Sequence, residues 1–154
     1  MKQWRTMAAI AAAGILAVTG CSKDDTLKLR NEQFTLNPAG ASGISGTVFI
    51  AENADSSFNV TVKLNRSVRD SIHVMNIYNT DQYANNEIAV KLVDIPGTGE
   101  AVIGETKNVR QAIETTGNFG SVTYDKVLSQ KRVVRVYLSQ TRMDSLLCTG
   151  EIGN

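Results

Sequence analysis

The sequence predicts an all-β domain, an antiparallel sandwich or barrel that carries one short helix. Residues 58–64 alternate apolar and polar side chains, which is the pattern of a strand buried on one face. Further β-branched, apolar segments of similar length follow at short spacing, with turn sequences between them. Because no long helical pattern separates these segments, antiparallel pairing is favoured over a parallel sheet with helical crossovers.

The predicted elements follow one another from residue 47 onward. Residues 47–50 form the first short strand, and 53–57 are a turn before the alternating strand. The remaining predicted strands are 72–78, 88–93, 101–106, 133–138 and 146–152. The sequence Pro-Gly-Thr-Gly at 96–99 is a turn between two of them. A helix is predicted at 124–128, where Asp125 favours the positive end of the helix dipole.

Charged residues indicate solvated surface rather than a nucleic-acid interface. Lys131, Arg132 and Arg135 accompany a valine-rich strand, and we interpret all three as its solvent face. The chain has 16 basic and 15 acidic residues. Loss of the segment containing Lys2 and Arg5 would leave 14 basic residues beside those 15 acidic ones. A nucleic-acid partner needs a basic face, so none is expected.

The N-terminal segment predicts a bacterial lipoprotein signal peptide over 1–20. Lys2 and Arg5 precede an apolar run at 7–18, which is shorter than the roughly 20 residues that a membrane span needs. Small residues then lead to Cys21, the predicted site of lipid (palmitate) attachment. The mature chain would begin there and sit on a membrane. An ordinary secretory signal is the alternative, but no A-x-A sequence ends the run.

The mature part divides into a tether and one domain. Residues 21–42 are polar with scattered apolar positions, and they end in Pro-Ala-Gly-Ala-Ser, a composition typical of linkers. We therefore expect a lipidated, flexible tether over 21–42. Its first part, Lys-Asp-Asp at 23–25, resembles the surface-export signals of Bacteroidetes lipoproteins, although a solvated tether without a routing role stays open. The remainder, 43–154, has the length of a single domain.

Cys148 has no partner for an internal disulfide if Cys21 carries a lipid. It lies in an apolar segment, and we interpret it as a small buried hydrophobe. A reactive thiol is the alternative. No neighbouring histidine or basic residue is present in the sequence to lower its pKa, which argues against that alternative.

Several segments of the predicted domain, in consistent order, resemble the chordin-type (CHRD) domain. They are 46–50, 58–64, 72–80, 123–128, 134–139 and 150–153. The last two resemble the ending of Bacteroidetes lipoproteins of this type, where a yINVHLS strand is followed by a GDIG close. The CHRD domain is similar in turn to copper–zinc superoxide dismutase. The resemblance therefore implies a Greek-key β-sandwich in a lipoprotein of the outer membrane.

The metal ligands that the resemblance implies are mostly missing. The family's pattern resembles H-x-x-H-I-H on the central strand, with another histidine in N-V-H near the C-terminus. His73 stands in the first place, Asn76 in the second, Tyr78 in the third and Tyr137 in the late one. Copper or zinc held by imidazoles needs three or four such ligands together. We therefore expect no metal, no cofactor and no superoxide dismutase activity.

The four degenerate positions have simpler interpretations. His73 is expected to be a hydrogen-bonded, partly buried residue rather than a ligand. If the strands align as in the family, Tyr78 and Tyr137 face one another and fill the former ligand space. The segment 81–87, which includes Tyr83 and the Asn85-Asn86 pair, offers oxygen atoms for calcium. It lacks the spacing of a calcium-binding loop, so a solvated loop is favoured.

Other catalytic motifs are absent from the sequence. It contains no G-x-S-x-G, P-loop, C-x-x-C or H-E-x-x-H pattern. Residues 25–27 and 144–146 resemble the short O-glycosylation motif of Bacteroidetes. Asn-x-Ser/Thr patterns begin at Asn59 and Asn65, and we interpret these as chance in a bacterial chain.

Three function classes compete. The first is a non-catalytic envelope lipoprotein with a binding or scaffolding role, attached to the membrane by its lipid and facing an envelope protein or glycan partner. The second is a metal-binding or redox protein with a reduced ligand set around His73. The third is a carbohydrate- or protein-binding module that acts through its loops.

Overall fold

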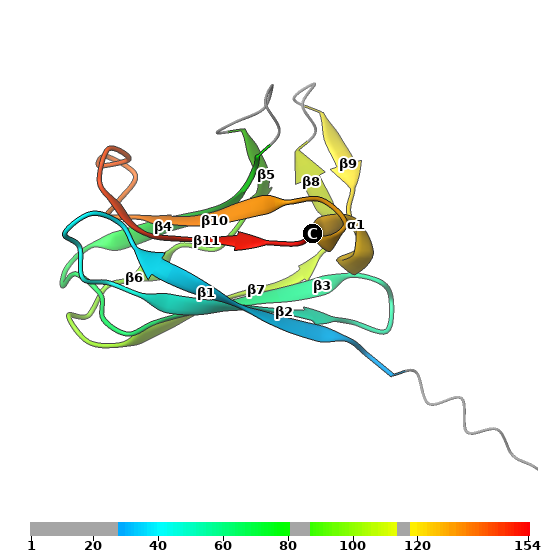
Figure 1. The fold of residues 1–154 in the computed structure, drawn as a ribbon, viewed down its shortest axis with the longest axis horizontal. Helices are drawn as coiled ribbons and strands as arrows, with labels where there is room; N and C mark the ends of the chain where they lie inside the picture. Colours follow the sequence, from blue (N-terminus) through cyan, green and yellow to red (C-terminus); the bar gives the residue numbers. More distant parts are fainter. Residues whose placement is uncertain (1–27, 81–86, 114–117) are drawn as a thin grey trace, which may run out of the picture.

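The computed structural model describes residues 28–80, 87–113 and 118–154, and they form an antiparallel β-structure in two layers (Figure 1). The predicted fold class is confirmed. The strands are β1 (Asn31–Pro38), β2 (Gly46–Glu52), β3 (Phe58–Leu64), β4 (Ile72–Asn79), β5 (Ile88–Lys91), β6 (Ile95–Pro96), β7 (Val102–Val109), β8 (Gln111–Ile113), β9 (Phe119–Ser121), β10 (Arg132–Tyr137) and β11 (Leu146–Ile152). Within the described residues α1 (Tyr124–Leu128) is the one helix.

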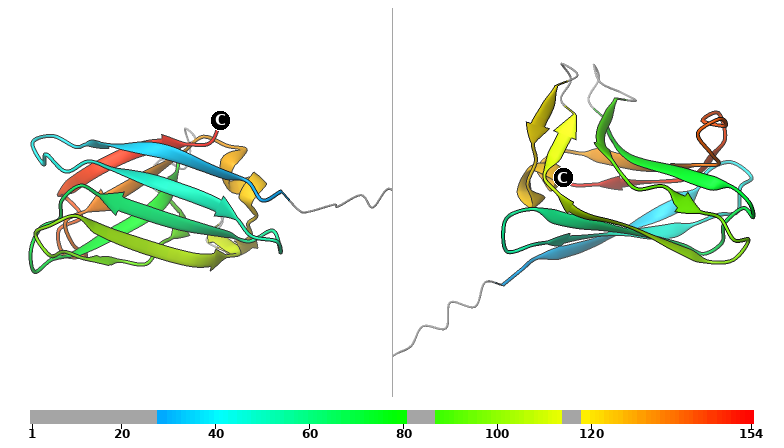
Figure 2. Two further views of the ribbon diagram at one scale, coloured as in Figure 1. Left: turned by 90° about the horizontal axis from the view of Figure 1, so that it is seen from below. Right: turned by 180° about the vertical axis from the view of Figure 1, so that it is seen from behind.

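The two layers are parts of one curled sheet. Hydrogen bonding runs in the order β5-β4-β10-β11-β1-β2-β3-β7, and β6 pairs with β4. β1 joins the layers, because most of its length pairs with β2 while Asn37 and Pro38 pair with β11. The two views of Figure 2 show the sheet bending round into a half-barrel, with the β8–β9 hairpin standing apart from it. Strands distant in sequence are thereby brought side by side.

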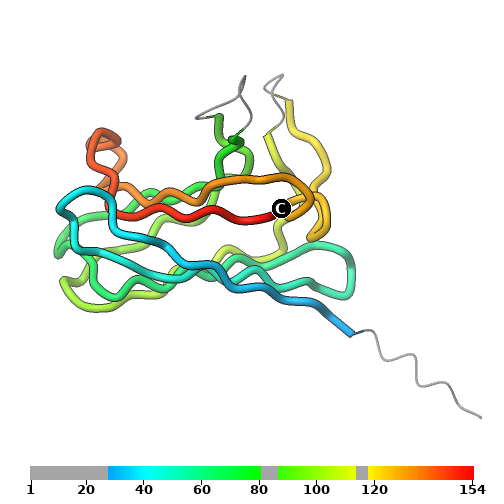
Figure 3. The backbone as a smooth tube through the Cα atoms, viewed as in Figure 1, coloured from blue at the N-terminus to red at the C-terminus, as the bar shows by residue number. Residues whose placement is uncertain are grey.

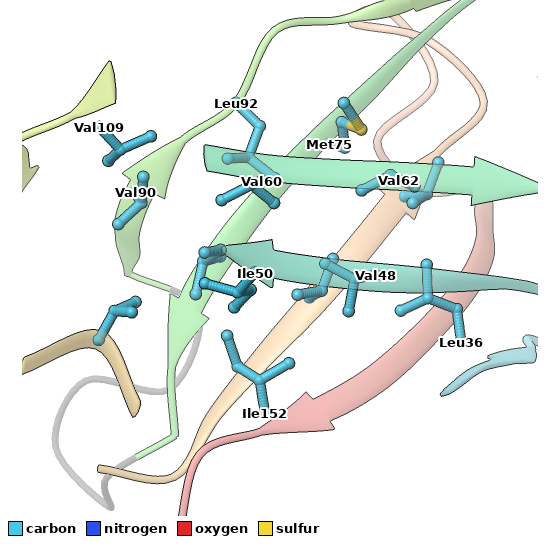
Figure 4. Packing of buried hydrophobic residues seen from close by; sticks show 14 of the residues in the cluster. Leu36, Val48, Ile50, Val60, Val62, Met75, Val90, Leu92, Val109 and Ile152 are labelled. Carbon is cyan, nitrogen blue, oxygen red and sulfur yellow. The ribbon is translucent and has the colours of Figure 1, made fainter. Parts of the chain in front are cut away.

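The core fills the space between the layers. Alternate residues of β3 are fully buried, with Val60 and Val62 at its centre, as the period of two predicts. Figure 4 shows them in one cluster with Met75 of β4 and Ile152 of β11, which come from the opposite layer. Because every second side chain of these strands points inward, residues far apart in sequence share a single hydrophobic core.

Residues 31–38 are not part of a tether. They form β1, in which Leu36 is fully buried and Phe34 packs against the core from the same face. The predicted boundary at residue 43 is therefore wrong, and the folded domain includes β1. The alternation of these two apolar residues is the signal for a strand, but the polar residues around them resemble a linker when read alone.

The other predicted elements agree with the structure to within a few residues. The predicted strand 58–64 coincides with β3, 146–152 with β11, and the predicted helix with α1. The helix begins after Thr123, whose hydroxyl accepts a hydrogen bond from the backbone N–H of Lys126 at 3.3 Å. The short hairpin of β8 and β9 was not predicted.

The two ends of the sandwich are formed by different segments of the chain. The start of β1, α1 and the C-terminus lie at one end of the layers (Figure 3). The β1–β2 turn, the β3–β4 connection and the β10–β11 connection lie at the opposite end. At the first end Arg30 donates hydrogen bonds to Glu52 and Asp125, and its guanidinium lies 4.9 Å from the centre of the Tyr124 ring. These contacts fasten the beginning of β1 to β2 and α1.

Candidate functional site

The four degenerate ligand positions lie on neighbouring strands but not on one face. His73, Asn76 and Tyr78 belong to β4, and Tyr137 to the adjacent β10. Because side chains alternate along a strand, His73 shares the inner face with Met75, while Asn76 and Tyr78 lie on the outer face. Tyr137 pairs with Val74 and lies on that outer face as well. The structure therefore brings three of the four residues together and separates His73 from them.

His73 is an interior residue with both ring nitrogens occupied. Its side chain is 0% exposed. Nε2 accepts a hydrogen bond from the backbone N–H of Val68 at 3.1 Å, and Nδ1 lies 2.9 Å from the carbonyl oxygen of Leu138. A carbonyl can only accept, so Nδ1 carries the proton and the ring is the neutral Nδ1–H tautomer. The residue is hydrogen-bonded as expected, but it is fully rather than partly buried.

Tyr78 and Tyr137 face one another, as predicted. Their ring centroids are 6.3 Å apart at an interplanar angle of 75°, an edge-to-face pair. The Tyr78 hydroxyl accepts a hydrogen bond from the Asn76 side-chain amide at 3.3 Å. Burial, opposed by that hydrogen bond, raises the pKa of Tyr78 above its usual range. A phenol that keeps its proton is a poor metal ligand, so the pair acts as packing.

The basic residues at the start of β10 and within it do not all lie on the solvent face, although the sequence predicted that they would. Lys131 is exposed, as predicted, but Arg132 is buried, so its assignment to the solvent face is wrong. Its guanidinium donates to the carbonyl oxygens of Lys126 and Val127, at 2.8 and 2.6 Å. Burial lowers its pKa. Arg135 is half-buried, and its guanidinium carbon lies 5.0 Å from the centre of the Tyr78 ring.

Cys148 lies in the hydrophobic core and is 0% exposed. Burial raises the pKa of its thiol to about 12. Because the thiolate is the reactive form of cysteine, this thiol is inert at neutral pH. The interpretation of Cys148 as a small buried hydrophobe is confirmed.

Other predicted sites fall outside the described residues. Cys21, the segment 81–86 with Tyr83, Asn85 and Asn86, and the motif at 25–27 all lie there. Over 28–80, 87–113 and 118–154, no three His, Cys, Asp or Glu side chains group closely enough to hold a metal ion. Across the same residues, no helix combines the length and the apolar character needed to cross a membrane.

The structure adds a groove that the sequence did not reveal. It opens at the loop end of the sandwich and has a volume of about 950 Å³. Three segments line it: residues 39–44 of the β1–β2 turn, residues 66–68 after β3, and Leu138 with 144–147 around the β10–β11 connection. The groove is shallow and open to solvent, its lining is largely apolar, and its volume is within the range of small-molecule sites.

Two of the groove walls are hydrogen-bonded to each other. The backbone N–H of Ala39 donates to the carbonyl oxygen of Leu147 at 2.9 Å, and the Ser42 hydroxyl donates to the same oxygen at 2.5 Å. The 39–42 segment, whose composition predicts a linker, is therefore a fixed wall of the groove. The small side chains of this segment leave the groove open. The same small residues are typical of flexible linkers, which is why the composition predicted one here.

His73 lies beneath this groove. Its two hydrogen-bond partners, Val68 and Leu138, both line the groove and belong to different walls. The imidazole thus bridges the segment after β3 and the segment after β10 from the interior. The one histidine of the sequence positions the walls of the groove and is not exposed in it.

Comparison of the chain with family models, with curated proteins and with solved structures finds no match.

Proposed function

We propose that this protein is a non-catalytic, lipid-anchored envelope protein of the CHRD type that binds a ligand in the end groove. The observation that carries the proposal is the position of the groove: it lies at the end of the sandwich opposite the start of β1 (Figure 1). β1 has eight residues, so at about 3.3 Å per residue it separates the two ends by about 26 Å. A lipid on Cys21 would hold the chain at the β1 end and leave the groove facing away from the membrane.

The contacts at the start of β1 support an anchoring role for that end. Arg30 donates to Glu52 Oε2 at 2.8 Å and to Asp125 Oδ1 at 2.6 Å. The hydrogen bond from Arg30 lowers the pKa of each carboxyl, so both stay ionised at neutral pH. The strand that follows the proposed tether is in this way secured to two other elements.

The sequence supports the cellular assignment. The basic start, the short apolar run and the small residues before Cys21 favour a lipoprotein of the outer membrane. The segments that resemble the CHRD domain favour a Bacteroidetes lipoprotein. For the metal-binding alternative, His73 would have to break a backbone hydrogen bond to become a ligand, so the geometry gives that alternative no support.

Membrane attachment is tested by changing Cys21→Ser. We expect the wild-type protein to fractionate with membranes and the variant to appear as an unprocessed or soluble form. Membrane association that persists in a processed Cys21→Ser variant contradicts the lipid anchor.

Ligand binding is tested with a groove-filling variant. Ala41 and Ala54 are both exposed turn residues, but only Ala41 lines the groove. The protein is purified from its own envelope, and the bound small molecules are extracted and measured by mass spectrometry. We expect Ala41→Trp to lose a compound that the wild type and the Ala54→Trp control retain. Equal recovery from all three proteins contradicts a ligand in the groove.

A further inference from the structure

The groove contains one cation without an acidic partner. Arg66 takes part in none of the ion pairs found among the described residues. Among the residues that the structure describes, its guanidinium donates one hydrogen bond, to the carbonyl oxygen of Ser42 at 3.4 Å. A guanidinium has five N–H donors, so most donors of this exposed side chain are not engaged by the described part of the protein and can bind a ligand in exchange for water.

The one acid that lines the groove is already neutralised. Asp144 Oδ1 accepts a hydrogen bond from Arg142 Nε at 3.1 Å, and that bond lowers the pKa of Asp144. Arg142 also donates to the Ser145 hydroxyl. The free charge of the groove is therefore the single positive charge of Arg66.

Two of the three hydroxyl groups that line the groove already both donate and accept. Ser42 donates to Leu147 and accepts from the backbone N–H of Ile44. Ser67 donates to the carbonyl oxygen of Glu100 and accepts from the backbone N–H groups of Thr98 and Gly99. A sugar, which needs several free donors and acceptors, would find few partners among these hydroxyls.

The rest of the lining is apolar. Its side chains are those of Ala39, Ala41, Ile44, Val68, Leu138, Leu146 and Leu147, and Gly40 completes it. Ile44 and Leu147 are buried and form part of the hydrophobic core, whereas Val68 is 38% exposed. An apolar group placed here would cover surface that now meets water.

We propose that the groove binds a small amphipathic carboxylate, with its carboxylate paired to Arg66 and its hydrocarbon part against the apolar lining. The planar guanidinium matches a carboxylate with two parallel hydrogen bonds. The inference rests on the proposed function, because it names the ligand class of the same groove.

The test compares three probes of equal chain length: octanoate, 1-octanol and octylammonium. The protein is the chain from residue 21 with Cys21→Ser, which keeps every described residue and carries no lipid. Binding is followed by amide chemical shifts of the groove residues in NMR spectra, at probe concentrations below micelle formation. We expect octanoate to bind about tenfold more tightly than 1-octanol, and octylammonium to bind most weakly.

Arg66→Gln should abolish the preference for octanoate and leave 1-octanol binding unchanged. Arg69→Gln removes the same charge three residues along, from a side chain that does not line the groove, and should bind like the wild type. An unchanged spectrum outside the groove establishes that each variant is folded. Equal affinity for octanoate and 1-octanol in the wild type overturns the carboxylate inference but leaves a binding groove. Absence of binding by all three probes also overturns it, and the envelope extraction with Ala41→Trp then decides the proposed function separately.

Discussion

The ring of Tyr137 meets the ring of Tyr78 edge to face, with 6.3 Å between the ring centroids. The two residues come from neighbouring antiparallel strands and share the outer face of the sheet. They are neither directly opposed nor diagonal neighbours, since Tyr78 pairs with Val133 and Tyr137 with Val74, and the Asn76–Arg135 pair lies between them. The two aromatic side chains are long enough to meet along the outer face across that intervening pair, at an interplanar angle of 75°.

The aromatic pair should stabilise the fold beyond the area that each ring buries. We expect a double-mutant cycle of Tyr78→Ala and Tyr137→Ala to give a coupling energy of about 0.5–1.5 kcal/mol, measured by urea unfolding. Tyr124 is the control partner, because it belongs to α1, which lies at the opposite end of the sandwich from the β10–β11 connection that follows Tyr137 (Figure 1). The effects of Tyr124→Ala and Tyr137→Ala on the free energy of unfolding should be additive. A coupling near zero for Tyr78 and Tyr137 contradicts the stabilising role.

Arg132 should be important for stability although its neighbour Lys131 is not. Arg132→Met keeps an apolar stem but leaves the buried carbonyl oxygen of Val127 without its side-chain donor, while the carbonyl oxygen of Lys126 keeps only the Ser129 hydroxyl. We expect the free energy of unfolding to fall by about 1–3 kcal/mol, the cost of buried unsatisfied groups. Lys131→Met removes an ion pair with Glu151 in which both side chains are mostly exposed, and should change stability by less than about 0.5 kcal/mol. Similar losses in the two variants would show that the buried hydrogen bonds are unimportant.

Cys148 should make stability depend on pH in alkaline solution. An unfolded thiol loses its proton above about pH 8.5, whereas the folded chain keeps it until the pKa of about 12. Deprotonation therefore favours the unfolded chain as pH rises through this window. In a chain with Cys21→Ser, we expect this thiol to lower the free energy of unfolding by about 2 kcal/mol between about pH 8 and pH 10. The difference is taken against Cys148→Ala, which lacks the titrating group. If the free energy of unfolding depends on pH in the same way in both proteins, the predicted effect of the thiol is refuted.

The protein should hold no stoichiometric copper or zinc. Both nitrogens of His73 are engaged by backbone groups, and its 0% exposure also prevents a site shared with a second chain. We expect elemental analysis after copper and zinc loading and dialysis to find far less than one ion per chain. Superoxide dismutase activity should be absent from the same sample. One tightly held ion per chain, lost in His73→Ala, would restore the metal-binding alternative.

Local periodicity was enough to predict most strands. The alternation at 58–64 identified β3, because a strand buried on one face repeats its environment every second residue. The same rule failed for β1, where Phe34 and Leu36 alternate among polar residues and the following small residues suggested a linker. Arg132 was misplaced for a related reason: its partners are the last carbonyls of α1, and a strand pattern carries no information about a neighbouring helix end.

By itself the sequence determined the all-β class, the position of α1 and the small number of imidazole ligands, since each depends on residue type and short-range spacing. The tertiary structure alone decided which face His73 occupies and that a groove exists. Ser42 and Leu147 are 105 residues apart, and their hydrogen bond forms because the end of β1 pairs with β11. Contacts of such long range leave no periodic trace in the sequence, because they depend on how the sheet curls and on which strand ends it brings together.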